Sequence, residues 1–82
     1  MYYVYVLENN VGRWYIGQTD NLMMRLNRHN NNEVKSTKNH GPWQVIYTEK
    51  HNLRTEAMRR EEYLKSGRGR NFLKLTLKLK SV

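Results

Sequence analysis

The feature that most constrains the fold is a pair of strand-like segments joined by a short turn near the start of the chain. Residues 2–8 and 14–18 are rich in aromatic and β-branched side chains, which favour extended backbone. Between them stands Asn9-Asn10-Val11-Gly12, and Asn and Gly tolerate the positive φ angles that tight hairpin turns require. We therefore expect an antiparallel hairpin, and with it a sheet against which the rest of the chain packs.

A helix is expected directly after the hairpin, over residues 22–30. The polar residues 19–21 offer side chains that can cap its first turn. Leu22, Met23 and Leu26 recur at helical spacing and form its expected apolar face.

A third strand and a second helix are expected further along. Residues 43–49 contain consecutive β-branched and aromatic side chains, which predict a strand. Thr55 is a candidate cap for a helix over residues 56–66, and Gly67 stands where a glycine commonly ends a helix.

The tail is compatible with two structures. Leucines alternate with polar residues at positions 73, 75, 77 and 79, which is the period of a strand, but a short, basic, distorted helix would also accommodate them. The element order is thus β-β-α-β-α plus a short C-terminal element. We expect an α+β fold, with a three-stranded antiparallel sheet flanked by helices, and a single domain over residues 1–82.

The amino-acid composition limits the kinds of protein that the chain can be. The absence of cysteine excludes a disulfide frame and a thiolate zinc site. No basic leader precedes the first apolar run, and no apolar stretch approaches the roughly 20 residues of a membrane helix, so we expect a cytoplasmic protein. Fifteen Lys and Arg against seven Asp and Glu give a net charge of +8, which favours a nucleic-acid partner over a basic surface that only aids solubility.

One carboxylate interrupts the apolar face of the second expected helix. Glu61 follows Ala57 by four residues and precedes Leu64 by three, whereas the side chain of Glu62 points about 100° away. A buried carboxylate is costly unless it is paired or holds a metal ion. Glu61 is therefore either an ion-pair partner or a metal ligand.

Four further side chains are candidates for chemistry. We expect Tyr5 and Tyr15 to face each other across the hairpin, and Arg25 and His29 to share one helix face because they are four residues apart. Taken alone, the tyrosines could be cross-strand packing and the other two a surface pair.

Five segments, in order, resemble the GIY-YIG endonuclease superfamily, in particular its small stand-alone bacterial members, which are related to the N-terminal nuclease domain of a bacterial excision-repair protein. The segments cover nearly the whole chain. They are Val4-Tyr5-Val6, Tyr15-Ile16-Gly17, residues 21–30 with Arg25 and His29 in Arg-x-x-x-His spacing, residues 57–65 around Glu61, and Ser66-Gly67-Arg68-Gly69-Arg70.

The resemblance implies a metal-dependent endonuclease that cuts nucleic acid, with DNA the expected substrate, and leaves 5′-phosphate and 3′-hydroxyl ends. Glu61 would bind one Mg²⁺ or Mn²⁺ ion, and Arg25 would hold a phosphate oxygen. Tyr5 or Tyr15 would orient or deprotonate the attacking water, assisted by His29. A tyrosine pKa is near 10, so a base role calls for the positive charge that Arg25 and the metal could supply. We expect Arg25, His29 and Glu61 to meet Tyr5 in one concavity.

Seven residues are expected to contact nucleic acid. Gln18 stands where the excision-repair relatives carry Lys, and Asn71 is a counterpart of a late Asn of the family. The full set is Gln18, Arg28, Lys35, Lys38, Arg68, Arg70 and Asn71. Two alternatives remain open, a non-catalytic nucleic-acid-binding module with the same fold and a basic RNA-associated structural protein. An inward carboxylate at Glu61 favours the nuclease, because without a metal it would repel phosphate.

Overall fold

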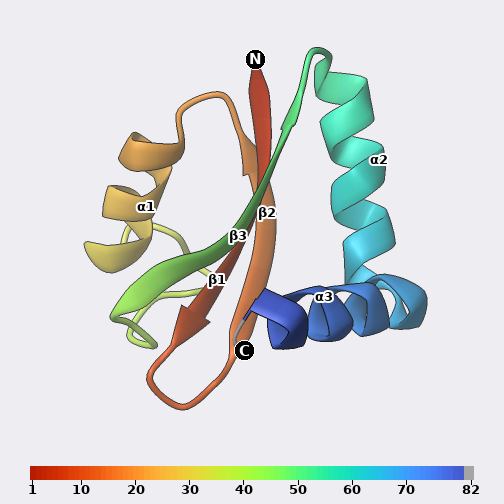
Figure 1. The fold of residues 1–82 in the computed structure, drawn as a ribbon. Helices are drawn as coiled ribbons and strands as arrows, with labels where there is room; N and C mark the ends of the chain where they lie inside the picture. Colours follow the sequence, from red (N-terminus) through yellow and green to blue (C-terminus); the bar gives the residue numbers. More distant parts are fainter. Residues whose placement is uncertain (81–82) are drawn as a thin grey trace.

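A central sheet and three helices make up the described part of the chain (Figure 1). The computed structural model describes residues 1–80. In chain order the elements are β1 (Tyr2–Asn9), β2 (Trp14–Thr19), α1 (Leu22–Asn30), β3 (Trp43–His51), α2 (Arg54–Lys65) and α3 (Gly67–Lys80). The strands are antiparallel and ordered β2-β1-β3, so β2 and β3 are the edges. The expected α+β class with a three-stranded antiparallel sheet is confirmed.

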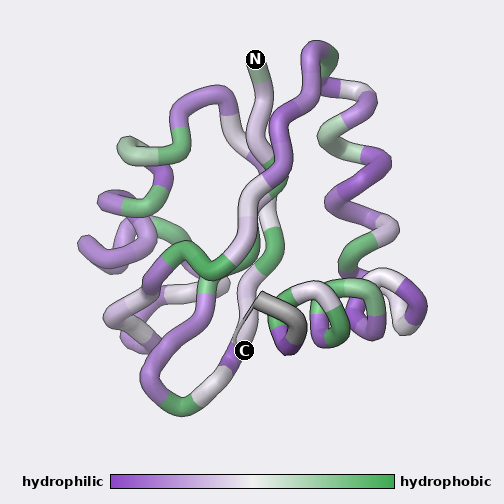
Figure 2. Tube along the Cα trace, viewed as in Figure 1, coloured by the Kyte–Doolittle hydropathy of each residue, from purple (hydrophilic) through white to green (hydrophobic). Residues whose placement is uncertain are grey.

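Alternation along β1 directs side chains into two separate cores. Figure 1 shows α1 on one face of the sheet and α2 and α3 on the other. Tyr5 and Leu7 pack on the α1 face, and Val4 and Val6 on the opposite face. That opposite core is completed by Ile16, Ala57, Leu64 and Leu73. Figure 2 shows α2 as mostly hydrophilic, with only a few hydrophobic residues along it.

The hairpin has the expected strands but a different register. Tyr5 pairs with Gly17, and Tyr15 pairs with Leu7. The expectation that the tyrosines face each other directly is therefore wrong; they share a face, one diagonal step apart. The exact pairing depends on turn length, because the turn leaves four residues between β1 and β2.

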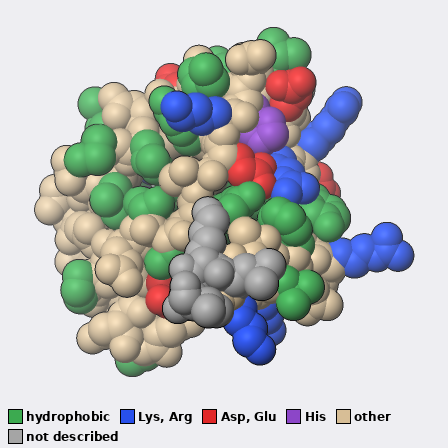
Figure 3. All heavy atoms as spheres, viewed as in Figure 1, with side chains coloured by type: hydrophobic (Ala, Val, Ile, Leu, Met, Phe, Trp, Pro, Cys, Tyr) green, Lys and Arg blue, Asp and Glu red, His purple; other side chains and the backbone are tan. Residues whose placement is uncertain are grey.

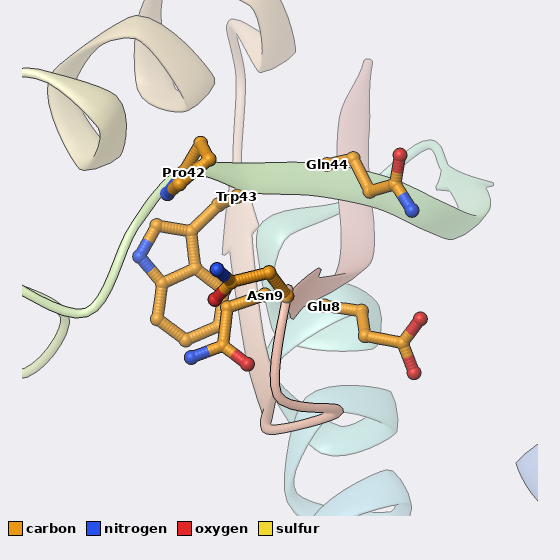
Figure 4. A pocket seen from close by; sticks show the side chains of 6 residues that line it. Glu8, Asn9, Pro42, Trp43 and Gln44 are labelled. Carbon is orange, nitrogen blue, oxygen red and sulfur yellow. The ribbon is translucent and has the colours of Figure 1, made fainter.

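The side chain of Asn9 fixes that turn. Its Oδ1 accepts hydrogen bonds from the backbone N–H groups of Val11 and Arg13, and its Nδ2 donates to the carbonyl of His40 at 2.9 Å. Asn9 also lines a small hollow of about 210 Å³ beside Trp43, as Figure 4 shows. The start of β2 is thereby fixed to the loop that precedes β3.

Helix α1 begins as expected, with Asn21 Oδ1 accepting the backbone N–H of Met24 at 3.1 Å. Leu22 and Leu26 pack against Tyr5 and Leu7. Met23, expected on the same apolar face, is 68% exposed, so that assignment is wrong. Its position one residue after Leu22 turns it toward solvent.

The boundaries of α2 differ from those expected. The helix starts at Arg54 rather than Glu56, and the Glu56 side chain, not Thr55, accepts the backbone N–H of Leu53 at 3.3 Å. Gly67 stands directly after the C-cap Ser66, as expected, but it does not have the positive φ typical of a glycine that ends a helix. The extended backbone of Ser66 ends α2, and Gly67 begins α3. The Ser66 hydroxyl accepts the backbone N–H of Gly69 at 3.2 Å, so it caps the next helix.

The tail is a helix, which decides between the two structures that the leucine pattern allowed. Leu73 is fully buried in the core under α2, whereas Leu75 is 65% exposed. The side chain of Leu79 lies outside the described residues. A period of two can arise in a helix when only some of the leucines are used for packing. Within the described residues, no helix is long and apolar enough to cross a membrane.

The corner between α2 and α3 requires a glycine at position 69. A Cβ at Gly69 would lie 2.1 Å from the carbonyl oxygen of Tyr63 and 2.4 Å from Cα of Leu64. Both neighbours are backbone atoms that cannot move aside without shifting α2. At Gly67, by contrast, a Cβ would meet nothing within 4 Å.

We expect Gly69→Ala to destabilise the protein by about 1–3 kcal/mol or more, because the added methyl group forces the two helices apart. Gly67→Ala is the matched control, and we expect it to be neutral or stabilising by up to about 1 kcal/mol through helix propensity. Urea denaturation of both variants measures the difference. Equal stabilities for the two would show that the corner is not closely packed.

Candidate active site

The Tyr5 hydroxyl is held from two sides within the α1 face of the sheet. The Tyr5 ring is buried, and its Oη lies 2.9 Å from His29 Nε2. Arg25 Nε donates a longer hydrogen bond of 3.4 Å to the same oxygen. Arg25 and His29 thus share the helix face that faces β1, as their spacing predicts.

A hydrogen bond with Thr37 determines which ring nitrogen of the neutral His29 carries the proton. Its Nδ1 lies 2.8 Å from Thr37 Oγ1, and the Thr37 hydroxyl donates to the carbonyl of Val34 at 3.4 Å. Because the single hydroxyl proton of Thr37 goes to Val34, Thr37 Oγ1 accepts from Nδ1–H of His29. Nε2 is then unprotonated, and it accepts the O–H of Tyr5.

Burial keeps both members of this hydrogen bond neutral. Desolvation, with a smaller contribution from the charges of Arg25 and Arg28, lowers the pKa of His29 to about 4. Desolvation also raises the pKa of Tyr5 to about 12, although its hydrogen bond with Arg25 acts in the opposite direction. The positive charge at Arg25 therefore does not make Tyr5 a ready base. At neutral pH the pair is a phenol donating to a neutral imidazole.

Gly17 makes room for this arrangement. It is the cross-strand partner of Tyr5, and a Cβ there would lie 2.6 Å from Tyr5 Oη and 3.1 Å from Cε1 of Tyr15. Without that side chain, the Tyr5 ring lies over the edge strand β2. The ring centroid of Tyr15 is 6.2 Å from that of Tyr5 and 4.7 Å from that of His29. The structure thus brings Tyr5, Tyr15, Arg25 and His29 together.

The expectation that Glu61 meets Tyr5 in one concavity is not confirmed, because Glu61 comes from the other layer of the fold. It lies on α2, which packs on the face opposite Tyr5, yet its negative charge is among the causes that raise the pKa of Tyr5. Gly17 lies on β2, which is an edge strand of the sheet. A groove of about 240 Å³ runs along this edge; its lining is Trp14, Tyr15, Ile16, Lys65 and Arg70.

Glu61 already has a partner. Lys65 Nζ donates to Glu61 Oε2 at 2.6 Å, one helical turn away, and the side chains of Lys65 and Glu61 are 52% and 23% exposed respectively. The ion-pair alternative for Glu61 is thus realised, in a partly exposed form. Such pairs within a helix contribute only about 0.3–0.5 kcal/mol, so the pair is weak enough to exchange for another cation. Glu62 is exposed, as expected.

The side chains that could bind a metal ion suit only a site with a single protein carboxylate. Among residues 1–80, no three His, Cys, Asp or Glu side chains cluster closely enough to form a protein cage. A single half-buried carboxylate fits an ion such as Mg²⁺, which keeps several waters and takes its other ligands from substrate phosphate. Glu61 is the residue that would hold it.

The seven expected nucleic-acid contacts do not form one surface. Arg68, Arg70 and Asn71 are exposed on the first turns of α3, whereas Lys35 and Lys38 are exposed between α1 and β3. Figure 3 shows Lys and Arg side chains standing out at several separate places on the face drawn.

The remaining two contacts lie in different surroundings. Arg28 is exposed, and its Nε is 4.0 Å from Glu33 Oε1. Gln18 is half-buried and pairs with Val4, and its buried Oε1 has no hydrogen-bond partner within the described part of the chain. A ligand donor could satisfy that oxygen.

Three site residues had no assigned role in the sequence. Thr37 orients His29 from a polar loop, where no periodicity marks it. Gly17 belongs to a recognised tripeptide, but its role depends on the exact register of the hairpin. Lys65 stands four residues after Glu61, and helical spacing alone could have indicated that pair.

Comparison with known proteins gives a consistent match. The family model of the GIY-YIG catalytic domain matches residues 1–74. A UPF0213 protein of Streptococcus agalactiae is 41% identical over 64 residues, which cover 77% of this chain and 73% of that protein. A UPF0213 protein of Clostridium perfringens is 39% identical over 66 residues, covering 79% and 71%.

One similar protein has a solved structure. The solution NMR structure of the UPF0213 protein BH0048 from Bacillus halodurans has a TM-score of 0.56 and 35% sequence identity. The match covers 95% of this chain and 86% of that one. The names of these relatives state no activity.

Because His29 is buried, we expect the free energy of unfolding to depend on pH. Its pKa of about 4 in the folded state is below the unfolded value of about 6.5, so the unfolded chain binds the additional proton between these values. The contribution of neutral His29 to the free energy of unfolding is therefore complete above pH 6.5 and is lost as the pH falls toward 4. The total loss is on the order of 3 kcal/mol.

His29→Gln removes the titrating group and is the matched comparison. We expect it to be less stable than the wild type at pH 7.5, with the difference narrowing as the pH falls to 4.5. Urea denaturation of both proteins across this range measures the effect. Parallel pH curves would contradict a buried, neutral His29.

Proposed function

The chain belongs to the GIY-YIG family of catalytic domains, and on that premise we propose that it is an endonuclease that hydrolyses nucleic-acid phosphodiester bonds with one divalent metal ion. The expected substrate is DNA, and the products carry 5′-phosphate and 3′-hydroxyl ends. The observation that supports the proposal is the Tyr5 hydroxyl, held by His29 and Arg25 within the electrostatic reach of Glu61.

Tyr5 and His29 form a relay for one proton. The Tyr5 O–H donates to His29 Nε2, so a lone pair of its oxygen is available to a water molecule. As that water attacks phosphorus, its proton passes to Tyr5 Oη while the proton of Tyr5 passes to His29. With a phenol pKa of about 12, a stable phenolate is not formed, and the two transfers are concerted.

Arg25 binds the phosphate. Its Nε is engaged by Tyr5, so the terminal guanidinium nitrogens are the ones that donate to a non-bridging oxygen. Its pKa is raised chiefly by the hydrogen bond with Tyr5, so the charge persists throughout the reaction. A fixed positive charge at this oxygen stabilises the negative charge that develops in the transition state.

Glu61 is the residue that would hold the metal ion. A bound Mg²⁺ or Mn²⁺ would supply Lewis-acid stabilisation of the phosphate and of the leaving 3′ oxygen. Lys65 would give up its hydrogen bond to Glu61 and turn toward the groove that it lines with Tyr15.

A second candidate function is binding without cleavage. It is favoured by the Lys65–Glu61 pair, because this cation already offsets the carboxylate charge and removes the need for a metal. The two candidates are distinguished most directly at Glu61.

Glu61→Gln keeps the size of the side chain and removes the charge that would hold the ion. We expect metal-dependent cleavage to be lost, while nucleic-acid affinity stays level or rises because a carboxylate near phosphate has gone. Since the pair with Lys65 is partly exposed, we expect a stability loss of only about 0.3–0.5 kcal/mol. A loss of about 3–5 kcal/mol, typical of a buried ion pair, is not expected.

Cleavage rates are measured on single-stranded, nicked and branched DNA and on RNA, each with Mg²⁺, Mn²⁺ or EDTA. Glu62→Gln is the control with the same chemical change on an exposed side chain, and we expect it to cut normally. A Glu61→Gln protein that cuts at the wild-type rate in Mg²⁺ would refute the metal role. Wild-type protein that binds but never cuts would favour the second candidate.

A further inference from the structure

A second, larger hollow continues from the groove beside Tyr15. It has a volume of about 610 Å³, and its lining is Glu8, Gly12, Arg13, Trp14, Arg70 and Lys74. Trp14 and Arg70 line both this hollow and the groove that contains Tyr15 and Lys65. The two spaces are therefore neighbours, and together they lead away from the candidate active site along the start of β2.

The larger hollow carries unpaired positive charge. Arg13, Arg70 and Lys74 are exposed, and their side chains have no hydrogen bond or ion pair within residues 1–80. Glu8 is the one acidic residue of the lining, and its Oε2 accepts Trp14 Nε1–H at 2.9 Å. Three cations against one carboxylate give this lining a charge of +2.

Rigid elements hold these cations in place. The backbone of Arg13 is fixed by the hydrogen bond of 2.8 Å from its N–H to Asn9 Oδ1, so the starting point of its side chain is fixed as well. Arg70 and Lys74 are four residues apart on α3, so they lie on one side of that helix. Arg60 on α2 differs from them, because its guanidinium is already bound to Glu49 at 2.9 Å.

We propose that the two hollows form one track for a single-stranded segment of nucleic acid that flanks the cleaved bond. Arg13, Arg70 and Lys74 bind successive phosphates, and the Trp14 indole stacks on an unpaired base. Cations interleaved with an aromatic ring are the chemistry that binds single strands, because a base offers its face for stacking only when it is not enclosed in a duplex.

This inference rests on the proposed function, which supplies the cleaved bond, and it names the class of substrate. The track begins at Tyr15 and Lys65, next to Tyr5 and Glu61, and ends at the hairpin turn. The substrate is therefore a nucleic acid with a single-stranded portion next to the scissile phosphate, rather than a continuous duplex.

Binding in EDTA tests the track without any cleavage. The affinity of the 82-residue chain for a fluorescent single-stranded DNA oligonucleotide is measured against salt, beside a duplex of the same sequence. The test variant is Arg13→Ser with Lys74→Ser. The control is Lys50→Ser with Arg59→Ser, which removes the same charge from exposed residues outside the track.

We expect the track variant to lose on the order of tenfold in single-strand affinity at low salt, and its log–log salt slope to fall by about 1.4, at roughly 0.7 per phosphate contact. The control variant should stay within about twofold of the wild type. Equal losses in the two variants would overturn the proposal, because charge alone would then explain binding. Circular dichroism confirms that both variants fold.

Tryptophan fluorescence gives a second readout. Trp14 is half-buried in the track, whereas Trp43 is 4% exposed in the core. Single-stranded DNA should quench the emission of the wild type but not that of Trp14→Phe. Unchanged wild-type emission at saturation would overturn the stacking role.

The two proposals fail separately. A wild-type protein that binds single strands through the track but cuts neither with Mg²⁺ nor with Mn²⁺ would refute the endonuclease and leave the track standing. Glu61-dependent cleavage by a track variant that binds normally would refute the track alone.

Discussion

The hydrogen bond between Tyr5 Oη and His29 Nε2 is the interaction on which the candidate site depends. It joins the central strand to α1 inside a core, where each partner loses its hydration. Burial favours the neutral form of both, so the bond is maintained by the same desolvation that opposes ionisation. Thr37 completes it by fixing which nitrogen of His29 carries the proton, and Gly17 supplies the space above β2.

The sheet separates the chemistry into two layers. In the proposed mechanism, proton transfer and phosphate binding take place on the α1 face, at Tyr5 and Arg25, whereas the carboxylate Glu61 belongs to α2, which packs on the opposite face. They can act together because β2 is an edge strand, beyond which no further strand intervenes among the described residues. The grooves beside Trp14 follow the same edge. A substrate that spans both layers would therefore have to lie along β2.

Most of the secondary structure could be predicted from local sequence patterns, whereas the helix corner and the surroundings of His29 depend on packing. The hairpin, α1 and the third strand have strong periodicity or turn chemistry, so their positions were expected closely. The tail was ambiguous because its leucines alternate with the period of a strand, although the chain there is a helix that buries Leu73 and exposes Leu75. Gly67 matched a helix end, but the corner is set by Gly69, whose need for space appears only when two helices cross. Thr37 carries no sequence signal because its role depends on the folded position of His29.

The protonation state of His29 tests the central claim most directly. Two-bond ¹H–¹⁵N correlation spectra of labelled protein distinguish the two neutral tautomers and the imidazolium, and a pH series gives the pKa. We expect the tautomer with hydrogen on Nδ1 at pH 7, unchanged until the pH approaches about 4. A His29 with hydrogen on Nε2, or one that titrates near the ordinary value of about 6.5, would contradict it.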